Sequence, residues 1–104
     1  MSTPLTLKTA RRDDGSVVLT ASGEIDLSNI ETFTEALSTV SSSGAPVTVD
    51  LGAVQYLDSG AINALFTYAE RIRLIVHPLL MRVLKISGLT ELTTVEPADH
   101  PRPE

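Results

Sequence analysis

Strand-like and helix-like segments alternate along most of this 104-residue chain, and their order restricts the fold more than any other feature. Two β-like runs, near residues 4–10 and 16–22, flank Asp14-Gly15, a dipeptide that favours a tight turn. A helical pattern follows, then a short strand at 47–51 and further helices. The alternation predicts an α/β fold: a mixed sheet with parallel inner strands, an N-terminal β-hairpin and about three helices.

The predicted helices carry apolar residues at helical spacing. Ser28 and Glu31 have the spacing of a capping box before the first helix. Pro78 suits the first turn of the third helix, and Gly88 suits its C-terminal end. The residues expected to face the core are, helix by helix, Ile30, Phe33, Leu37 and Val40; Ile62, Leu65, Phe66, Ala69 and Ile72; and Leu79, Leu80, Val83, Leu84 and Ile86.

The segments between and after these helices are less regular. Residues 74–76 are apolar and favour a short strand; the alternative is that the strand is lost, which would leave an edge exposed or exchanged between molecules. A last edge strand is expected at 91–95. Residues 96–104 hold three prolines and predict a flexible tail, so the folded domain is expected to cover residues 1–95.

Composition restricts the class of protein. The formal net charge of −5 argues against direct binding to nucleic acid or to anionic membranes. The chain has no cysteine, which excludes disulfides and thiol catalysis. It also has no secretory signal and no apolar run long enough to cross a bilayer, so a cytoplasmic location is expected.

Asp58 and Ser59 stand where a strand gives way to the second helix, the place where α/β proteins hold ligands and reactive groups. One interpretation is that either residue caps the helix. The other is that the Ser59 hydroxyl is exposed for modification at a helix start, where free N–H groups and the helix dipole accept a phosphate. The two interpretations are compatible with each other.

No set of catalytic or metal-binding residues is apparent. The glycines of a hydrolase nucleophile elbow are missing around Ser59, and His77 and His100 are poorly placed as bases. Asp50, expected at a strand end, lacks the acidic pair and late lysine of a phospho-acceptor receiver site. No His, Asp and Glu set has ligand spacing. We therefore expect no catalytic residue, no metal and no cofactor.

Three blocks of the sequence resemble the STAS domains of bacterial anti-sigma-factor antagonists. They are GEIDLSNIETF (23–33), VTVDLGAVQYLDSGAINALF (47–66) and LLMRVLKISGL (79–89). The resemblance runs from the hairpin to about Val95. It implies a non-enzymatic regulatory protein that binds an anti-sigma factor, often a GHKL-type serine kinase, and thereby frees a sigma factor.

The resemblance also implies the site. The kinase would phosphorylate Ser59, directly after Asp58, and the phosphoprotein would release its partner until a phosphatase resets it. We expect Asp26, Asp50 and Asp58 to lie near the site on loops at one sheet edge. The partner-binding residues implied are Glu24, Asp26, Ser28, Asp58, Ser59, Gly60 and Asn63.

The chain departs from the family pattern in two places. Gly60 and Ala61 stand where a second Ser or Thr and then a glycine usually follow, and the segment 71–78 is shorter than usual. These departures favour an alternative: a STAS scaffold or sensor that is not phosphorylated and assembles with other STAS or regulatory domains. A homodimer is compatible with both functions.

Overall fold

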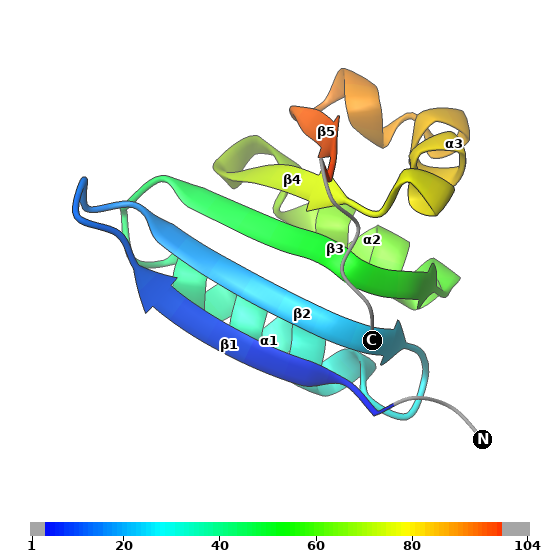
Figure 1. Ribbon diagram of the computed structural model, residues 1–104, viewed down its shortest axis with the longest axis horizontal. Coiled ribbons are helices and arrows are strands. Elements are labelled where there is room, and N and C mark those ends of the chain that lie inside the picture. The colour runs from blue at the N-terminus through cyan, green and yellow to red at the C-terminus, as the bar shows by residue number, and fades with distance from the viewer. Residues whose placement is uncertain (1–3, 99–104) are drawn as a thin grey trace.

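The strands of the sheet lie side by side in chain order, as the computed structural model describes them for residues 4–98 (Figure 1). β1 is antiparallel to β2, and the three remaining neighbouring pairs are parallel. This confirms the predicted mixed sheet with an N-terminal hairpin. The strands are β1 Thr6–Arg11, β2 Val17–Ile25, β3 Val47–Leu57, β4 Ile72–Val76 and β5 Val95–Pro97.

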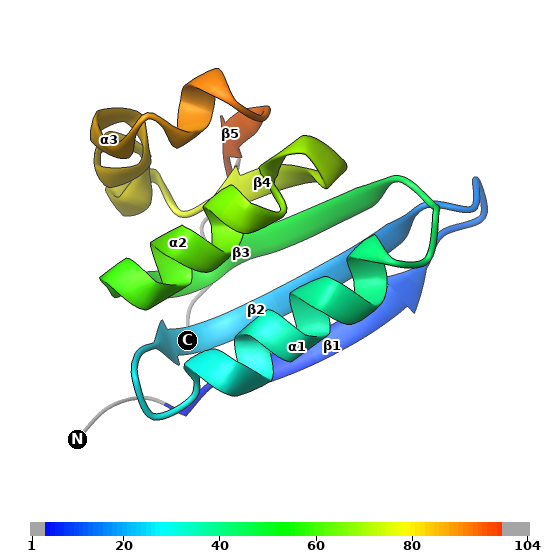
Figure 2. The ribbon, with the colours of Figure 1, turned by 180° about the vertical axis from the view of Figure 1, so that it is seen from behind.

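Three α-helices connect the parallel strands: α1 Ile30–Ser41, α2 Ser59–Thr67 and α3 Pro78–Ser87. Crossovers between parallel strands are right-handed, and here each one steps to the next strand in the same direction. The helices α1 and α2 therefore pack on the same face of the sheet, as Figure 2 shows. The helix α3 lies beyond α2, beside β4 and β5 (Figures 1 and 2). None of the helices in residues 4–98 has the length and apolar character needed to cross a membrane.

The hydrophobic core lies between the sheet and these helices. On α1, Phe33 and Leu37 are completely buried, and Leu65 is completely buried on α2. They meet the alternate residues of the central strands, among them Leu19 and Val49. Aliphatic side chains thus supply most of the core, as the scarcity of aromatic residues requires.

The short strand favoured at 74–76 is present as β4. The helix α2 ends at Thr67 with Tyr68 as its C-cap, and one 3₁₀ turn, η1 Ala69–Arg71, brings the chain into the strand. β4 then pairs in parallel with β3 of the same molecule. A single 3₁₀ turn replaces the longer loop, so the compressed connection needs neither a lost strand nor an exchanged one.

The central strand is longer than predicted. β3 runs to Leu57, and Asp50 is buried within it instead of standing at its end. The expectation that Asp50 joins Asp26 and Asp58 at one edge was therefore wrong, because seven residues of strand, about 23 Å, separate it from Leu57. The register between β2 and β3 shifts twice, so β-bulges accommodate the additional residues of β3 relative to β2.

Two further predictions of local structure were wrong. Asn29 precedes α1, with no side-chain capping bond, so Ser28 and Glu31 do not form a capping box. The last strand is Val95–Pro97; residues 89–91 form a second 3₁₀ turn, η2 Leu89–Glu91. Residues 99–104, most of the predicted tail, lie outside the described residues.

The prediction for the inner face of α3 was correct for only part of the set. Leu80 and Leu84 are buried, but Leu79, Val83 and Ile86 are exposed. The ends of the helix are as predicted: Pro78 occupies its first turn, and Gly88 follows it at φ 90°, a left-handed conformation that a glycine adopts without strain.

Candidate functional site

The candidate site lies where the parallel strands β2 and β3 end side by side. Ile25 and Leu57 form their last pair, and the Asp58 N–H donates to the Ile25 carbonyl oxygen at 3.1 Å. This bond joins the end of β2 to the N-cap of α2. The carboxyl end of neighbouring parallel strands is the usual place for a functional site in an α/β sheet.

Asn29 holds the loop of residues 26–29 in a fixed shape. Its side-chain oxygen accepts from the Asp26 N–H at 3.0 Å, and its side-chain nitrogen donates to the Glu24 carbonyl oxygen at 2.9 Å. A backbone bond from the Asn29 N–H to the Asp26 carbonyl oxygen closes the turn. The sequence prediction missed Asn29; its signal was an asparagine immediately before the first apolar residue of a helix.

Ser28 binds the carboxylate of Asp26 within the same loop. Its backbone N–H and its hydroxyl both donate to Asp26 Oδ1, at 2.9 and 2.5 Å. The hydroxyl bond, and then the backbone bond, lower the pKa of the Asp26 carboxyl below its ordinary value. Asp26 is therefore a negative charge at neutral pH, held beside the end of β2.

Asp58 is the N-cap of α2, which confirms one of the two interpretations of the Asp58-Ser59 pair. Its backbone is extended, and its Oδ1 accepts from the Ala61 N–H at 2.9 Å. This bond satisfies one of the N–H groups that the start of a helix leaves free.

Ser59 is the first residue of α2, and it is exposed. Within residues 4–98 its hydroxyl has no hydrogen-bond partner. Asp58 thus provides the cap, which leaves the Ser59 side chain without a structural role in the described part of the chain.

Gly60 lies close to α1. A Cβ at this position would stand 3.3 Å from Asp58 Oδ1 and 3.5 Å from Ile30 Cγ1. The next residue, Ala61, is completely buried in the core. A side chain at position 60 would therefore contact Ile30 at an ordinary distance and approach the Asp58 carboxylate closely. With glycine there, Ser59 presents the single hydroxyl at the start of α2.

Of the other residues predicted for the site, Glu24 lies near the end of β2, opposite Tyr56. Asn63 is exposed on α2, one turn after Ser59. The structure adds Leu27, whose side chain is 84% exposed in the loop of residues 26–29. An exposed leucine in a loop gives no sequence signal, because apolar residues there are ordinarily read as core.

The site is strongly acidic. Between Arg12 and Arg71 the chain has no lysine, arginine or histidine, although this stretch contains most of its 13 acidic residues. Glu24, Asp26 and Asp58 all belong to it. Within residues 4–98 no group of three or more His, Cys, Asp or Glu side chains is arranged to hold a metal ion.

A family model described as Mlab, STAS domain matches residues 9–94, which is most of the chain. The chain belongs to the STAS domain family. This confirms the resemblance drawn from the three sequence blocks. No curated protein matches the chain by sequence.

Several solved structures have the same fold as this chain. An anti-sigma factor antagonist from Mycobacterium paratuberculosis is 25% identical with a TM-score of 0.84, and the match covers 95% of this chain and 92% of that one. The unphosphorylated form of the anti-sigma factor antagonist SpoIIAA is 16% identical with a TM-score of 0.71, covering 91% and 90%. The phosphorylated form of SpoIIAA from Bacillus is 21% identical with a TM-score of 0.58, covering 91% and 93%. The structural neighbours of this chain thus include anti-sigma factor antagonists.

Proposed function

We propose that this chain is an anti-sigma-factor antagonist that binds an anti-sigma factor and is switched off by phosphorylation of Ser59. The partner would be a serine kinase of the GHKL type, and a phosphatase would restore the hydroxyl. The observation that carries this proposal is the exposed Ser59 hydroxyl at the start of α2. Its similarity to an antagonist at a TM-score of 0.84 supports the same function.

The geometry of the helix start suits a phosphate. The Asp58 side chain accepts from the Ala61 N–H. The N–H groups of Ser59 and Gly60 remain available at the N-terminal end of α2. Together with the helix dipole they favour an anion at this point. A phosphate on Ser59 could therefore be accommodated while α2 keeps its position.

The same phosphate would change what the site offers to a partner. It adds about −1.5 to −2 charges next to the carboxylates of Asp26 and Asp58. A partner shaped to a small neutral hydroxyl would meet both bulk and charge. A loss of about 3 kcal/mol at the interface lowers affinity by roughly a hundredfold, which is enough to exchange one partner for another.

The test combines the purified chain with candidate anti-sigma kinases encoded in the same genome. After incubation with ATP, intact mass should show one added phosphate, and peptide mapping should place it on Ser59. Ser59→Ala should abolish the mass shift and keep the partner bound, whereas Ser59→Glu should weaken binding. Ser43→Ala is the control, because Ser43 is an exposed serine in the loop between α1 and β3, outside the predicted partner-binding residues. This variant should still be phosphorylated. Ordinary binding by Ser59→Glu would contradict the switch.

A STAS scaffold that is not phosphorylated is the second candidate. The glycine at position 60 favours it, because the second hydroxyl of the usual motif is absent and a side chain there would come within 3.3 Å of Asp58 Oδ1. In this case the chain would assemble with STAS or other regulatory domains, or with itself. Partner binding would then be the same for the wild type, Ser59→Ala and Ser59→Glu.

A further inference from the structure

The outer face of α3 carries a row of exposed apolar side chains. Leu79, Val83 and Ile86 follow one another at helical spacing, with 67%, 44% and 76% of their surfaces exposed. Leu92, directly after the 3₁₀ turn η2, is 51% exposed. Contiguous exposed apolar side chains on a small domain mark an interaction surface.

This apolar row is accompanied by positive charge. Arg82 and Lys85 are exposed on α3, and the helix has no acidic residue. The one ion pair formed among residues 4–98, between Arg73 and Glu96, involves neither of them. The surface formed by Leu79, Arg82, Val83, Lys85 and Ile86 is called the α3 face below; it suits an acidic partner surface with apolar contacts.

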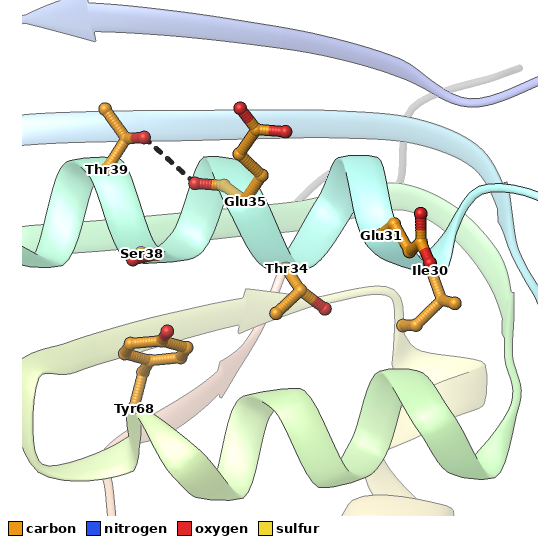
Figure 3. A pocket seen from close by; sticks show the side chains of 7 residues that line it. All are labelled: Ile30, Glu31, Thr34, Glu35, Ser38, Thr39 and Tyr68. Atoms are coloured by element: carbon orange, nitrogen blue, oxygen red, sulfur yellow. Dashed lines mark hydrogen bonds between the residues drawn. The ribbon is translucent and has the colours of Figure 1, made fainter.

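A surface of the opposite charge lies between α1 and α2. Here a shallow groove of about 470 Å³ is lined mainly by α1, with Tyr68 on the opposite side (Figure 3). Glu31 and Glu35 border this groove with two negative charges, and neither is in an ion pair within the described residues. Ile30 and Tyr68 provide apolar surface near its two ends (Figure 3). The remaining lining residues are Thr34, Ser38 and Thr39. The Glu35 side chain points away from Tyr68 (Figure 3), and it also lines a second shallow groove on the β1 side of α1.

The two surfaces match in length and in the spacing of their charges. Leu79 to Ile86 rises about 10 Å along a helix axis, and Ile30 to Thr39 rises about 13 Å. Arg82 and Lys85 are one helical turn apart, as are Glu31 and Glu35. Within one molecule the two surfaces cannot meet, because α2 lies between α1 and α3 (Figure 2).

We propose that the groove between α1 and α2 binds the α3 face of a second copy of this chain. Arg82 and Lys85 of one copy pair with Glu31 and Glu35 of the next, while Leu79, Val83 and Ile86 cover Ile30 and Tyr68. The contact joins two different surfaces, so it is heterologous: repeated copies close into a ring or extend as a chain. The association involves neither Ser59 nor an anti-sigma factor, so it stands or fails independently of the proposed function.

Sedimentation velocity of the purified chain, from low-micromolar to millimolar concentration, tests the contact. The wild type should form species larger than a monomer as concentration rises. High salt should weaken them, because exposed ion pairs are screened. R82E/K85E and E31K/E35K should each weaken association by at least about tenfold, since attraction becomes repulsion. Far-UV circular dichroism checks that each variant remains folded.

Mixing the two charge-reversed variants is the decisive measurement. The wild-type α3 face of E31K/E35K then meets the wild-type groove of R82E/K85E, and the two reversed surfaces also complement each other. The equimolar mixture should associate about as well as the wild type. R11E/R12E is the matched control: it reverses the same number of exposed positive charges in the β1–β2 hairpin and should leave association unchanged.

Three results would overturn the proposal. The first is a wild-type chain that stays monomeric up to millimolar concentration. The second is association that R82E/K85E weakens but E31K/E35K does not, which would indicate a symmetric contact between two α3 faces. The third is a mixture that fails to associate although both separate variants are folded.

Discussion

Single residues at the candidate site are held by short-range hydrogen bonds between neighbours in the sequence. Asp58 bonds to a backbone group three residues ahead, and Asp26 bonds to Ser28 two residues ahead. Bonds of this kind depend on residue type and spacing. For that reason the Asp58 cap could be predicted from an aspartate placed just before a helical pattern.

The hydrogen bonds around Asn29 could not be predicted in the same way. A Ser followed three residues later by a Glu favours a capping box, but the Ser28 hydroxyl binds Asp26 instead. Asn29 then stands before the helix and uses its amide to join Glu24 and Asp26. Several local hydrogen bonds of similar energy compete here, and the fold of the loop decides between them.

Replacing Ser28 with alanine should raise the pKa of the Asp26 carboxyl toward its ordinary value. The Ser28 hydroxyl stabilises the ionised form, and this bond is lost in the variant. In the wild type the lowered pKa contributes stability at neutral pH, and this contribution disappears as pH falls through the lowered value. NMR titration of the Asp26 side chain from neutral pH into acid should show the difference between the two chains. An unchanged titration midpoint would contradict the role given to the hydroxyl.

Replacing Asp58 with alanine should destabilise the protein by about 1 kcal/mol, because the Ala61 N–H loses its cap. Asp58→Asn should restore most of this loss, since asparagine is an equally good N-cap. Asp13→Ala is the control, an exposed aspartate in the hairpin. Urea unfolding at neutral pH measures all three variants. Equal stabilities for Asp58→Ala and the wild type would show that the cap contributes nothing.

At the scale of whole elements, periodicity showed where helices occur but not which of their faces are covered. On α3 the apolar residues occupy two sides of the helix: Leu80 and Leu84 enter the core, while Leu79, Val83 and Ile86 do not. A helix with two apolar sides looks like an ordinary amphipathic helix with a wide apolar stripe. Only the position of α3 at the edge of the sheet determines which apolar side is buried and which is exposed.

The sequence prediction made β3 too short for a related reason. The residues Asp50 and Gly52 look like the end of a strand, because charged residues and glycine are uncommon inside one. In the structure they lie within β3, and Asp50 Oδ1 accepts from the Gly52 N–H at 2.9 Å. Local bonding inside the strand thus replaces the turn that these residue types favour.

Replacing Ser41, the last residue of α1, with alanine should stabilise the protein. Its hydroxyl is buried and has no hydrogen-bond partner within residues 4–98. Removing an unsatisfied buried hydroxyl recovers its desolvation cost, about 1 kcal/mol. The midpoint of urea unfolding should rise. Ser42→Ala is the control with the opposite expectation, because the Ser42 hydroxyl donates to the Ser38 carbonyl oxygen. A lower midpoint for Ser41→Ala would show that the hydroxyl is satisfied.

At the scale of the whole molecule, the alternation of strand and helix patterns was sufficient to predict the layered architecture. Each parallel pair requires a crossover, each crossover is right-handed, and the strands follow in chain order. These constraints place α1 and α2 on one face and bring the ends of β2 and β3 together. The sequence could therefore place Ser59 at the edge where β2 and β3 end, whereas Asp50 was misplaced because the length of β3 was not known.

Phosphorylation of Ser59 should leave this architecture unchanged. The phosphate would gain about 0.3–1 kcal/mol from the start of α2, while Asp26 and Asp58 repel it. We therefore expect the free energy of unfolding to change by no more than about 1 kcal/mol. A chain synthesised with phosphoserine at position 59 should show amide chemical-shift changes in the loop of residues 26–29 and the first turn of α2. The amides of residues 12–16, in the turn between β1 and β2, and those of β5 should not move, because they lie in other parts of the fold (Figure 1). Shift changes spread over the whole sheet would mean that the phosphate acts by remodelling the fold and not by altering the surface that a partner meets.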